Sequence, residues 1–305
     1  MVIEQILSLA NNAVRWQFTA MERSLRAAGC DLPLQVIPYD ENLFALPKNA
    51  SWLDDTAIFS AVRDAQAVKL CRKYAALVQR RCAFFDSDII HLRDPRAALE
   101  PLPNKVFIVA DTEWNKARWT FTPETREIFL AESTLWALWN FNSGFFAYED
   151  APVNVADVTA FLSSPIGAIA RGASPTSSEQ EGANFLIHQS RVEVVNLCLP
   201  PHRMESTMAC DYPDHFADLL SLPNRPFFMH FASNVLASEA RIVKLFSEFL
   251  TREESAEYVA EQQKRQAALT RSAQWPIWAR VANRLLPYID QRFRLHWQPA
   301  AGSVG

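Results

Sequence analysis

Ala83-Phe84-Phe85-Asp86-Ser87-Asp88-Ile89-Ile90-His91 is the stretch around which this chain is organised: an apolar run stops at two carboxylates one residue apart and then resumes. Because residues i and i+2 of a strand point to the same side, Asp86 and Asp88 can converge on one ligand. Two carboxylates this close repel each other unless a cation or a proton lies between them, and oxygen ligands suit Mg2+ or Mn2+. The stretch therefore predicts a divalent metal site, with a solvated turn as the alternative.

The segments before this stretch predict a β-α-β unit. Residues 6–10 and 34–39 are short apolar runs typical of buried strands, and residues 14–28 between them carry apolar side chains at helical spacing up to Gly29. A right-handed crossover makes two such strands parallel. In open α/β sheets ligands bind outside the carboxyl ends of the strands, and the two carboxylates lie at such an end.

The remaining segments alternate between strand and helix patterns. Residues 40–60 predict a loop, and the tryptophans of residues 112–140 are expected mostly to fill a core. Further strands are predicted at residues 106–110, 192–197 and 226–231, and further helices at residues 68–80, 154–162 and 178–189.

Three cations lie in the first turns of the helix predicted over residues 68–80, namely Lys69, Arg72 and Lys73. A cation opposes the helix dipole there, so each needs either solvent or an anion. Solvent is the expectation for the group, because long cationic side chains are mostly exposed. Lys69 is the candidate for contact with a ligand.

The composition indicates a soluble globular protein. Of the 305 residues 49% are hydrophobic, so a large core can form. A formal net charge of -4, without a basic patch in the first 250 or so residues, argues against a nucleic-acid partner. Five widely spaced cysteines without a C-x-x-C pair indicate free thiols and no zinc site. Neither a signal peptide nor a membrane-spanning stretch is evident, and the cytoplasm is the expected location.

The end of the first predicted strand carries Ala10, Asn11 and Asn12. The chain has seven glycines and no G-x-G-x-x-G, so a dinucleotide fingerprint and a P-loop are absent and a nucleotide must be held in another way. The Asn amides suit the edge of a base or ribose, and capping of the next helix explains them equally well.

Three weaker patterns follow further along the chain. Asn142-Ser143-Gly144 precedes an apolar strand, and Gly144 allows a ligand to approach the backbone closely. Glu179 and Gln180 lie in the first turn of a predicted helix, where capping and the dipole alone explain an acid. His230 lies between apolar residues, where a core histidine is the alternative to a ligand.

Four motifs in order carry a family resemblance: FFDSDI at 84–89, FNSGFF at 141–146, SEQEGANFL at 178–186 and MHFAS at 229–233. Together they resemble the nucleotide-diphospho-sugar transferases of the GT-A fold, specifically those similar to glycosyltransferase family eight. The resemblance covers roughly residues 5–235. It implies a Rossmann-like α/β fold with a mixed, mostly parallel sheet flanked by helices, and a hexosyltransferase-like activity.

The resemblance also implies roles for individual residues. Asp86, Asp88 and His230 would bind Mn2+ or Mg2+ on the diphosphate of the donor, a UDP-sugar by expectation. Asn142 and Gly144 would line the sugar pocket, and Glu179 with Gln180 would bind sugar hydroxyls. The residues expected on the nucleotide side are Ala10, Asn11, Asn12, Lys69, Asp86 and Ser87. The resemblance leaves the acceptor open among a glycan, a lipid-linked sugar and a protein, and it favours retention of the anomeric configuration.

The chain departs from the family at two places. Glu179 stands where the family has Asp, and Ser233-Asn234-Val235 stands in place of the family's glycine and Lys-Pro-Trp. Two other classes remain open. A haloacid-dehalogenase-type phosphatase also uses a strand with D-x-D, but its pair belongs to the first strand and is followed at fixed spacing by Thr or Val, whereas Ile90 stands here and about 80 residues precede the pair. A non-catalytic binding protein of the same fold is the second alternative.

Two domains are predicted, a transferase domain over residues 1–250 and a basic helical tail over residues 251–305. From Lys264 onward the tail is locally about +6. Its helical apolar positions are Trp278, Val281, Leu285 and Ile289. This face is expected either to pack on the catalytic domain or to contact an anionic membrane surface peripherally.

Overall fold

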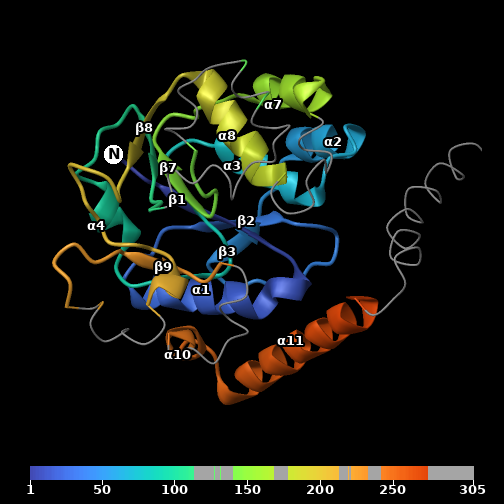
Figure 1. Ribbon diagram of the computed structural model, residues 1–305, viewed down its shortest axis with the longest axis vertical. Helices are drawn as coiled ribbons and strands as arrows, with labels where there is room; N and C mark the ends of the chain where they lie inside the picture. Colours follow the sequence, from blue (N-terminus) through green and yellow to red (C-terminus); the bar gives the residue numbers. More distant parts are fainter. Residues whose placement is uncertain are drawn as a thin grey trace, which may run out of the picture. The chain divides into compact units, whose positions relative to one another are not determined.

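The computed structural model describes residues 1–112, 140–167, 178–212, 221–232 and 242–273, with Glu127, Ala131 and Leu219 as single residues between them (Figure 1). The chain divides into two units, Met1–Thr251 and Arg252–Gly305. Helix α11 (Arg252–Ala273) is the described part of the second unit. No helix in the described ranges has the length and apolar character needed to cross a bilayer.

The first unit is built on a seven-stranded sheet with the strand order β3-β2-β1-β4-β7-β6-β8. Strands β1, β2, β3 and β4 run parallel to one another, β8 runs parallel to β6, and β7 is antiparallel to both β4 and β6. The strands are β1 (Gln5–Ala10), β2 (Leu34–Pro38), β3 (Ala50–Trp52), β4 (Cys82–Phe85), β6 (Val106–Val109), β7 (Phe145–Tyr148) and β8 (Glu193–Asn196). A separate two-stranded sheet pairs β5 (Ile89–His91) with β9 (Phe228–His230) in antiparallel fashion.

Helices cover both faces of the large sheet, with α2, α3, α7 and α8 on one side and α1 on the other (Figure 1). The alternation of side chains along each strand builds two core layers: Phe84 packs in one layer and Phe85 in the other. The helices are α1 (Arg15–Ala27), α2 (Thr56–Asp64), α3 (Tyr74–Leu77), α4 (Pro95–Leu99), α7 (Val155–Ser163), α8 (Ser178–Ser190) and α10 (Val243–Ser247), with 3-10 helices η1 (Asn12–Val14), η2 (Lys69–Lys73) and η5 (Ala209–Asp211).

The predicted fold class, a mixed and mostly parallel sheet flanked by helices, is confirmed. Two local predictions were wrong. Residues 40–60 contain β3 and the start of α2, which the Asp55 side chain caps by accepting a hydrogen bond from the Ile58 backbone N–H. The helix predicted over residues 68–80 is the 3-10 helix η2 followed by the single turn α3, because the chain turns at Arg81, with a φ of 49°, into β4.

Some predictions concern residues outside the described part of the chain. These are most of the tryptophan-rich segment, at residues 113–126, 128–130 and 132–139, the segment Ser233-Asn234-Val235, and the tail from residue 274 onward. Core packing of those tryptophans and both expectations for the tail helix therefore stay predictions.

Candidate active site

The two carboxylates lie in the turn between β4 and β5, rather than within one strand as expected. The large sheet ends at Phe85, and the Asp86 backbone N–H donates to the carbonyl oxygen of Gly144 at 2.8 Å. The Ile89 N–H then donates to the Asp86 carbonyl at 3.2 Å, which closes the turn. Asp86, Ser87 and Asp88 are all half-buried. This turn, and not the geometry of a strand, therefore brings the two carboxylates to the same side.

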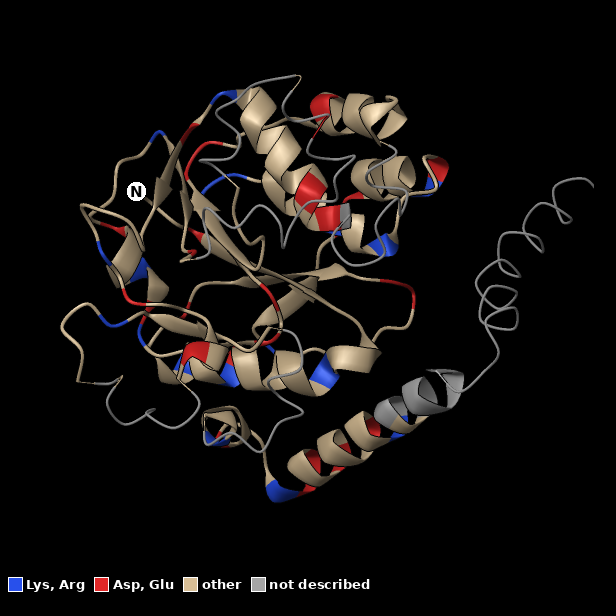
Figure 2. Ribbon diagram, in the orientation of Figure 1, with Lys and Arg blue, Asp and Glu red and all other residues tan. Residues whose placement is uncertain are grey.

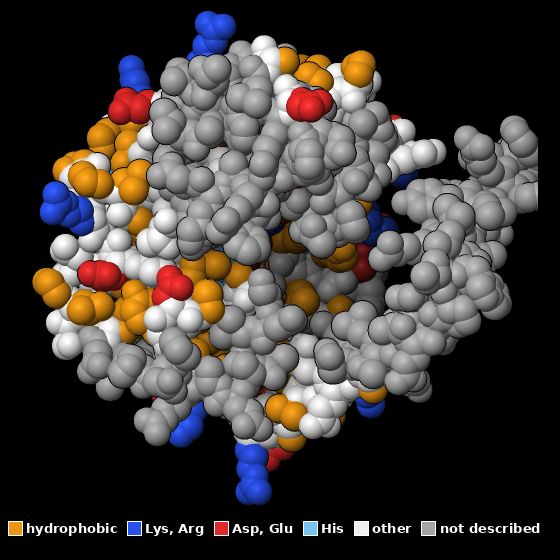
Figure 3. Space-filling model, in the orientation of Figure 1, with side chains coloured by type: hydrophobic (Ala, Val, Ile, Leu, Met, Phe, Trp, Pro, Cys, Tyr) orange, Lys and Arg blue, Asp and Glu red, His pale blue; other side chains and the backbone are white. Residues whose placement is uncertain are grey.

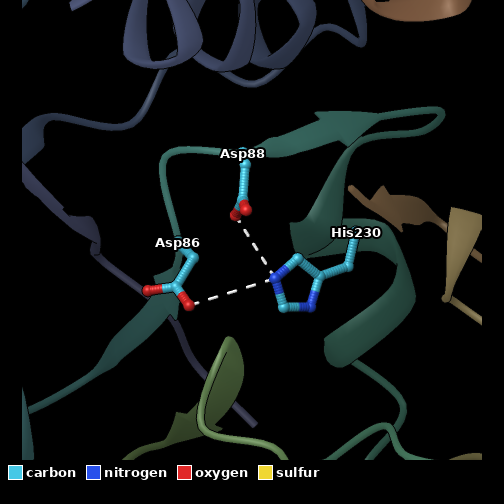
Figure 4. Close-up of side chains that lie close together, drawn as sticks. All are labelled: Asp86, Asp88 and His230. Atoms are coloured by element: carbon cyan, nitrogen blue, oxygen red, sulfur yellow. Dashed lines mark ion pairs between the residues drawn. The ribbon is translucent and has the colours of Figure 1, made fainter. Parts of the chain in front are cut away.

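His230 reaches this turn through the small sheet. It is the last residue of β9, it lies opposite Ile89 of β5, and the next N–H, that of Phe231, donates to the Asp88 carbonyl at 2.9 Å. Its Nε2 lies 3.2 Å from Asp88 Oδ1 and 4.0 Å from Asp86 Oδ2 (Figure 4). One ligand atom from each of the three side chains lies within 4.8 Å of the others. The structure thus brings together the three residues predicted to bind a metal.

The charges of this group stabilise one another. Burial lowers the pKa of His230, but the carboxylates of Asp88 and Asp86 outweigh burial and raise that pKa above its usual value. Burial raises the pKa of Asp88, and the facing imidazole brings it below the usual range. The imidazole of His230 and the carboxylate of Asp88 therefore each favour the charged form of the other.

Gly144 lies directly against the imidazole ring. A Cβ atom at this position would lie 2.3 Å from Cε1 and 2.8 Å from Nδ1 of His230, and 2.9 Å from Oδ1 of Asn142. Such contacts are far shorter than van der Waals separation, so a glycine is required for the observed position of the ring. The sequence predicted close approach at Gly144, and the group that approaches in the structure is His230.

Lys73 is buried beside the acidic turn, so the prediction that it is exposed to solvent was wrong. Solvent was the expectation, yet the side chain is 3% exposed, with Nζ 2.9 Å from Asp86 Oδ1 and 3.4 Å from Glu179 Oε1. Burial lowers the pKa of Lys73, but the carboxylates of Asp86 and Glu179 outweigh it and raise the pKa above its usual value. A charged ammonium is therefore enclosed between two acids from different parts of the chain.

Glu179 and Gln180, in the first turn of α8, are joined to this group through Ser143. The Ser143 Oγ donates to Glu179 Oε2 at 3.2 Å, and the Ser143 N–H donates to Gln180 Oε1 at 3.2 Å. Lys73 Nζ also lies 3.4 Å from both the carbonyl oxygen and Oγ of Ser143. Burial raises the pKa of Glu179, and Lys73 opposes this rise.

Asn142 fixes the turn that carries Ser143 and Gly144. Its Oδ1 accepts from the Gly144 N–H at 2.8 Å, and its own N–H donates to Asp111 Oδ2 at 2.7 Å. The turn therefore connects the ends of β4 and β6 with α8 and with His230. Ser143 and Lys73 were not predicted as site residues, because neither carries a local signal that separates it from an ordinary turn or surface residue.

Of the residues predicted for the nucleotide side, Asp86 and Ser87 lie in the acidic turn, and the others form a second group near the carboxyl ends of β1 and β2. Asn11 Nδ2 donates to Asp40 Oδ2 at 2.9 Å, and the Asn12 N–H donates to the Asn42 carbonyl at 2.8 Å. Ala10 is fully buried at the end of β1 and its carbonyl accepts from the Tyr39 N–H. Lys69 forms an exposed ion pair with Glu41 at 2.8 Å.

Comparisons with known proteins address the fold. No protein-family model matches this sequence, and no curated protein matches it. The bifunctional glycosyltransferase WbbM is similar in structure, with a TM-score of 0.53 and 14% identity over 84% of this chain and 51% of that chain. The apo-form glycosyltransferase GlyE of Streptococcus pneumoniae TIGR4 gives a TM-score of 0.46 and 13% identity over 87% of this chain and 64% of that one. The galactosyltransferase LgtC gives a TM-score of 0.43 and 12% identity over 81% of this chain and 96% of that one.

The chain spans about half the length of WbbM. At 14% identity the similarity to WbbM shows a shared fold. The GT-A fold expected from the four motifs is confirmed by this match and by the topology of the sheet.

Proposed function

We propose that this chain is a metal-dependent glycosyltransferase, which moves a sugar from a nucleoside diphosphate donor to an acceptor. The observation that carries the proposal is the convergence of Asp86 and Asp88, in the turn between the two sheets, with His230 of β9, beside the buried Lys73 and Glu179. The fold shared with WbbM, a glycosyltransferase, supports it. The transferase domain of this proposal comprises residues 1–250.

The three side chains fit a divalent ion. An octahedral ion with ligands at about 2.1 Å has neighbouring ligand atoms about 3 Å apart and opposite ones about 4 Å apart. The distances from His230 Nε2 to the two carboxylates, 3.2 Å and 4.0 Å, are of this size. Carboxylate oxygens with one imidazole suit Mn2+ or Mg2+. When bound there, the ion would neutralise charge on the departing nucleoside diphosphate.

Lys73 orients Asp86 for this role. It binds Oδ1 of Asp86, so that Oδ2 is the oxygen that faces His230. Because Lys73 also contacts Glu179, the carboxylate on α8 is held at a fixed place beside the metal ligands. We assign Glu179, Gln180 and Asn142 to the sugar side, since Ser143 holds both α8 residues against the turn that Asn142 begins.

The donor and the stereochemistry complete the proposal. We assign a UDP-sugar as donor, a glycan, lipid-linked sugar or protein as acceptor, and retention of configuration at the anomeric carbon. NMR of the product formed from an α-linked donor tests the last point: an α product is expected, and a β product contradicts retention.

The test of the activity is turnover of UDP-, GDP- and TDP-sugars with Mn2+, followed as release of the nucleoside diphosphate. Turnover is expected with one class of donor, and removal of the metal by EDTA or the substitution Asp88→Ala is expected to abolish it. Asp150→Ala is the matched control, because Asp150 forms an exposed ion pair with Arg80 and is expected to leave the rate unchanged.

Circular dichroism of Asp88→Ala is the control for folding, and a spectrum like that of the wild-type chain is expected. Full turnover by the folded variant would refute the metal assignment. Donor binding without turnover by the wild-type chain would instead identify a non-catalytic binding protein, and release of phosphate from a phosphomonoester would favour the phosphatase alternative.

A further inference from the structure

A second polar group lies at the carboxyl end of the sheet, in the loop that follows β2. The order β3-β2-β1-β4 places the end of β2 two strands from the end of β4, where Asp86 lies. Adjacent strands are about 4.8 Å apart, so the ends of β2 and β4 are separated by about 10 Å. Figure 2 shows acidic residues in the segment after β2, and Figure 3 shows a hollow on this face with charged side chains of both signs at its rim.

The two asparagines expected to contact the nucleoside, Asn11 and Asn12, form hydrogen bonds with this loop. Asn11 donates to Asp40 from Nδ2 at 2.9 Å and accepts from the Ala13 N–H at Oδ1 at 3.0 Å. The Asn12 N–H donates to the Asn42 carbonyl, and Arg15 donates to Asn12 Oδ1 at 3.3 Å. The Asn11 side chain and the Asn12 backbone N–H thus hold the loop against β1.

Glu41, at the centre of this loop, has a carboxylate that is both fixed and open to solvent. Lys69 Nζ lies 2.8 Å from Oε2 and Arg72 Nη2 lies 2.5 Å from Oε1, while the Glu41 side chain is 71% exposed. Arg72 is itself anchored: Nη1 donates to the Pro38 carbonyl at 3.2 Å, and the guanidinium lies 5.3 Å from the centre of the Phe59 ring. Each oxygen therefore keeps acceptor capacity on its solvent side.

We propose that Glu41 accepts hydrogen bonds from the ribose hydroxyls of the donor and selects ribonucleotides over 2′-deoxyribonucleotides; the inference rests on the proposed function. Two oxygens held side by side match the vicinal hydroxyls of a ribose. An acid at the end of the second strand of a parallel sheet with this strand order takes the ribose hydroxyl in dinucleotide-binding proteins. The separation of about 10 Å between the ends of β2 and β4 leaves room for a ribose near the first and a diphosphate at the acidic turn.

The test compares the affinities of the full chain for UDP and 2′-deoxy-UDP, and for GDP and 2′-deoxy-GDP, by titration calorimetry with Mn2+. A hydrogen bond to a charged acceptor corresponds to about tenfold or more in affinity, and this is the expected preference of the wild-type chain for the ribonucleotide. Glu41→Ala is expected to bring the ratio close to one. Glu41→Gln, which keeps an acceptor without its charge, is expected to give an intermediate ratio.

Asp150→Ala is the control, because it removes an exposed carboxylate from a comparable ion pair, with Arg80. It is expected to keep the full preference. Equal affinity of the wild-type chain for both members of a pair, or an unchanged ratio in Glu41→Ala, overturns the assignment of Glu41. If none of the four nucleotides binds with Mn2+, the proposed function fails as well, so the two failures are distinguished.

Discussion

Two lysines four residues apart on η2 have opposite surroundings. Lys69 is 54% exposed and pairs with Glu41, which is 71% exposed, whereas Lys73 is 3% exposed and is enclosed by Asp86 and Glu179. An exposed ion pair contributes about 0–1 kcal/mol to stability because water screens it. A buried charge loses its hydration and depends on its partners. The same short helix therefore carries one lysine, Lys69, whose ion pair contributes little to stability, and another, Lys73, whose ion pairs are needed to compensate for its burial.

The largest difference is expected between Lys73→Met and Lys69→Met. The first leaves Asp86 and Glu179 without their shared cation, and breaking a buried ion pair costs about 3–5 kcal/mol of the free energy of unfolding. The second is expected to cost less than about 1 kcal/mol. Urea denaturation of both variants measures the difference. Equal losses would show that the burial of Lys73 has no energetic consequence.

The next effect concerns the contact between Gly144 and His230. Gly144→Ala is expected to push the imidazole away from Asp88, which lowers Mn2+ affinity about 10–100-fold and destabilises the fold by about 1–3 kcal/mol. Mn2+ titration followed by electron paramagnetic resonance measures the affinity.

Gly29→Ala is the matched control for that variant. Gly29 has a φ of 90°, and a Cβ there meets no atom within 4 Å, so the substitution strains the backbone without touching the site. It is expected to lower stability and leave Mn2+ affinity unchanged. Wild-type Mn2+ affinity in Gly144→Ala would mean that the position of His230 does not depend on this glycine.

The last predicted effect is a dependence of stability on pH at the buried His91, the last residue of β5. Burial lowers its pKa to about 3, and neither ring nitrogen has a hydrogen-bond partner among the described residues. Below the usual pKa of about 6.5 the unfolded chain takes up a proton that the folded chain does not. The folded state therefore loses up to about 1.4 kcal/mol per pH unit as the pH falls from 6.5 toward 3.

His91→Leu is expected to remove that part of the acid dependence, measured as denaturation midpoints between pH 7 and pH 5. His202→Leu, at a half-buried position outside the sheets, is the control. A slope that does not change in His91→Leu would contradict the assignment to His91.

The sequence alone determined most of the strands and the position of the acidic pair. Apolar runs ending in polar residues predicted β1, β2, β4, β6, β8 and β9 to within about two residues, because burial on both faces of a sheet requires uninterrupted apolar segments. The order of four short motifs predicted the GT-A fold, which the structure confirms. The roles of the site residues stay predictions.

Only the tertiary structure decided which charges face one another. Lys69 and Lys73 belong to one cationic run, and nothing in that run distinguishes the exposed lysine from the buried one. The distinction depends on Asp86 and Glu179, which are 13 and 106 residues away from Lys73 in the chain. Local propensity determines how a segment folds, but the burial of a charge depends on partners that only the folded sheet brings within reach. The burial of Lys73 could therefore not be predicted from the sequence.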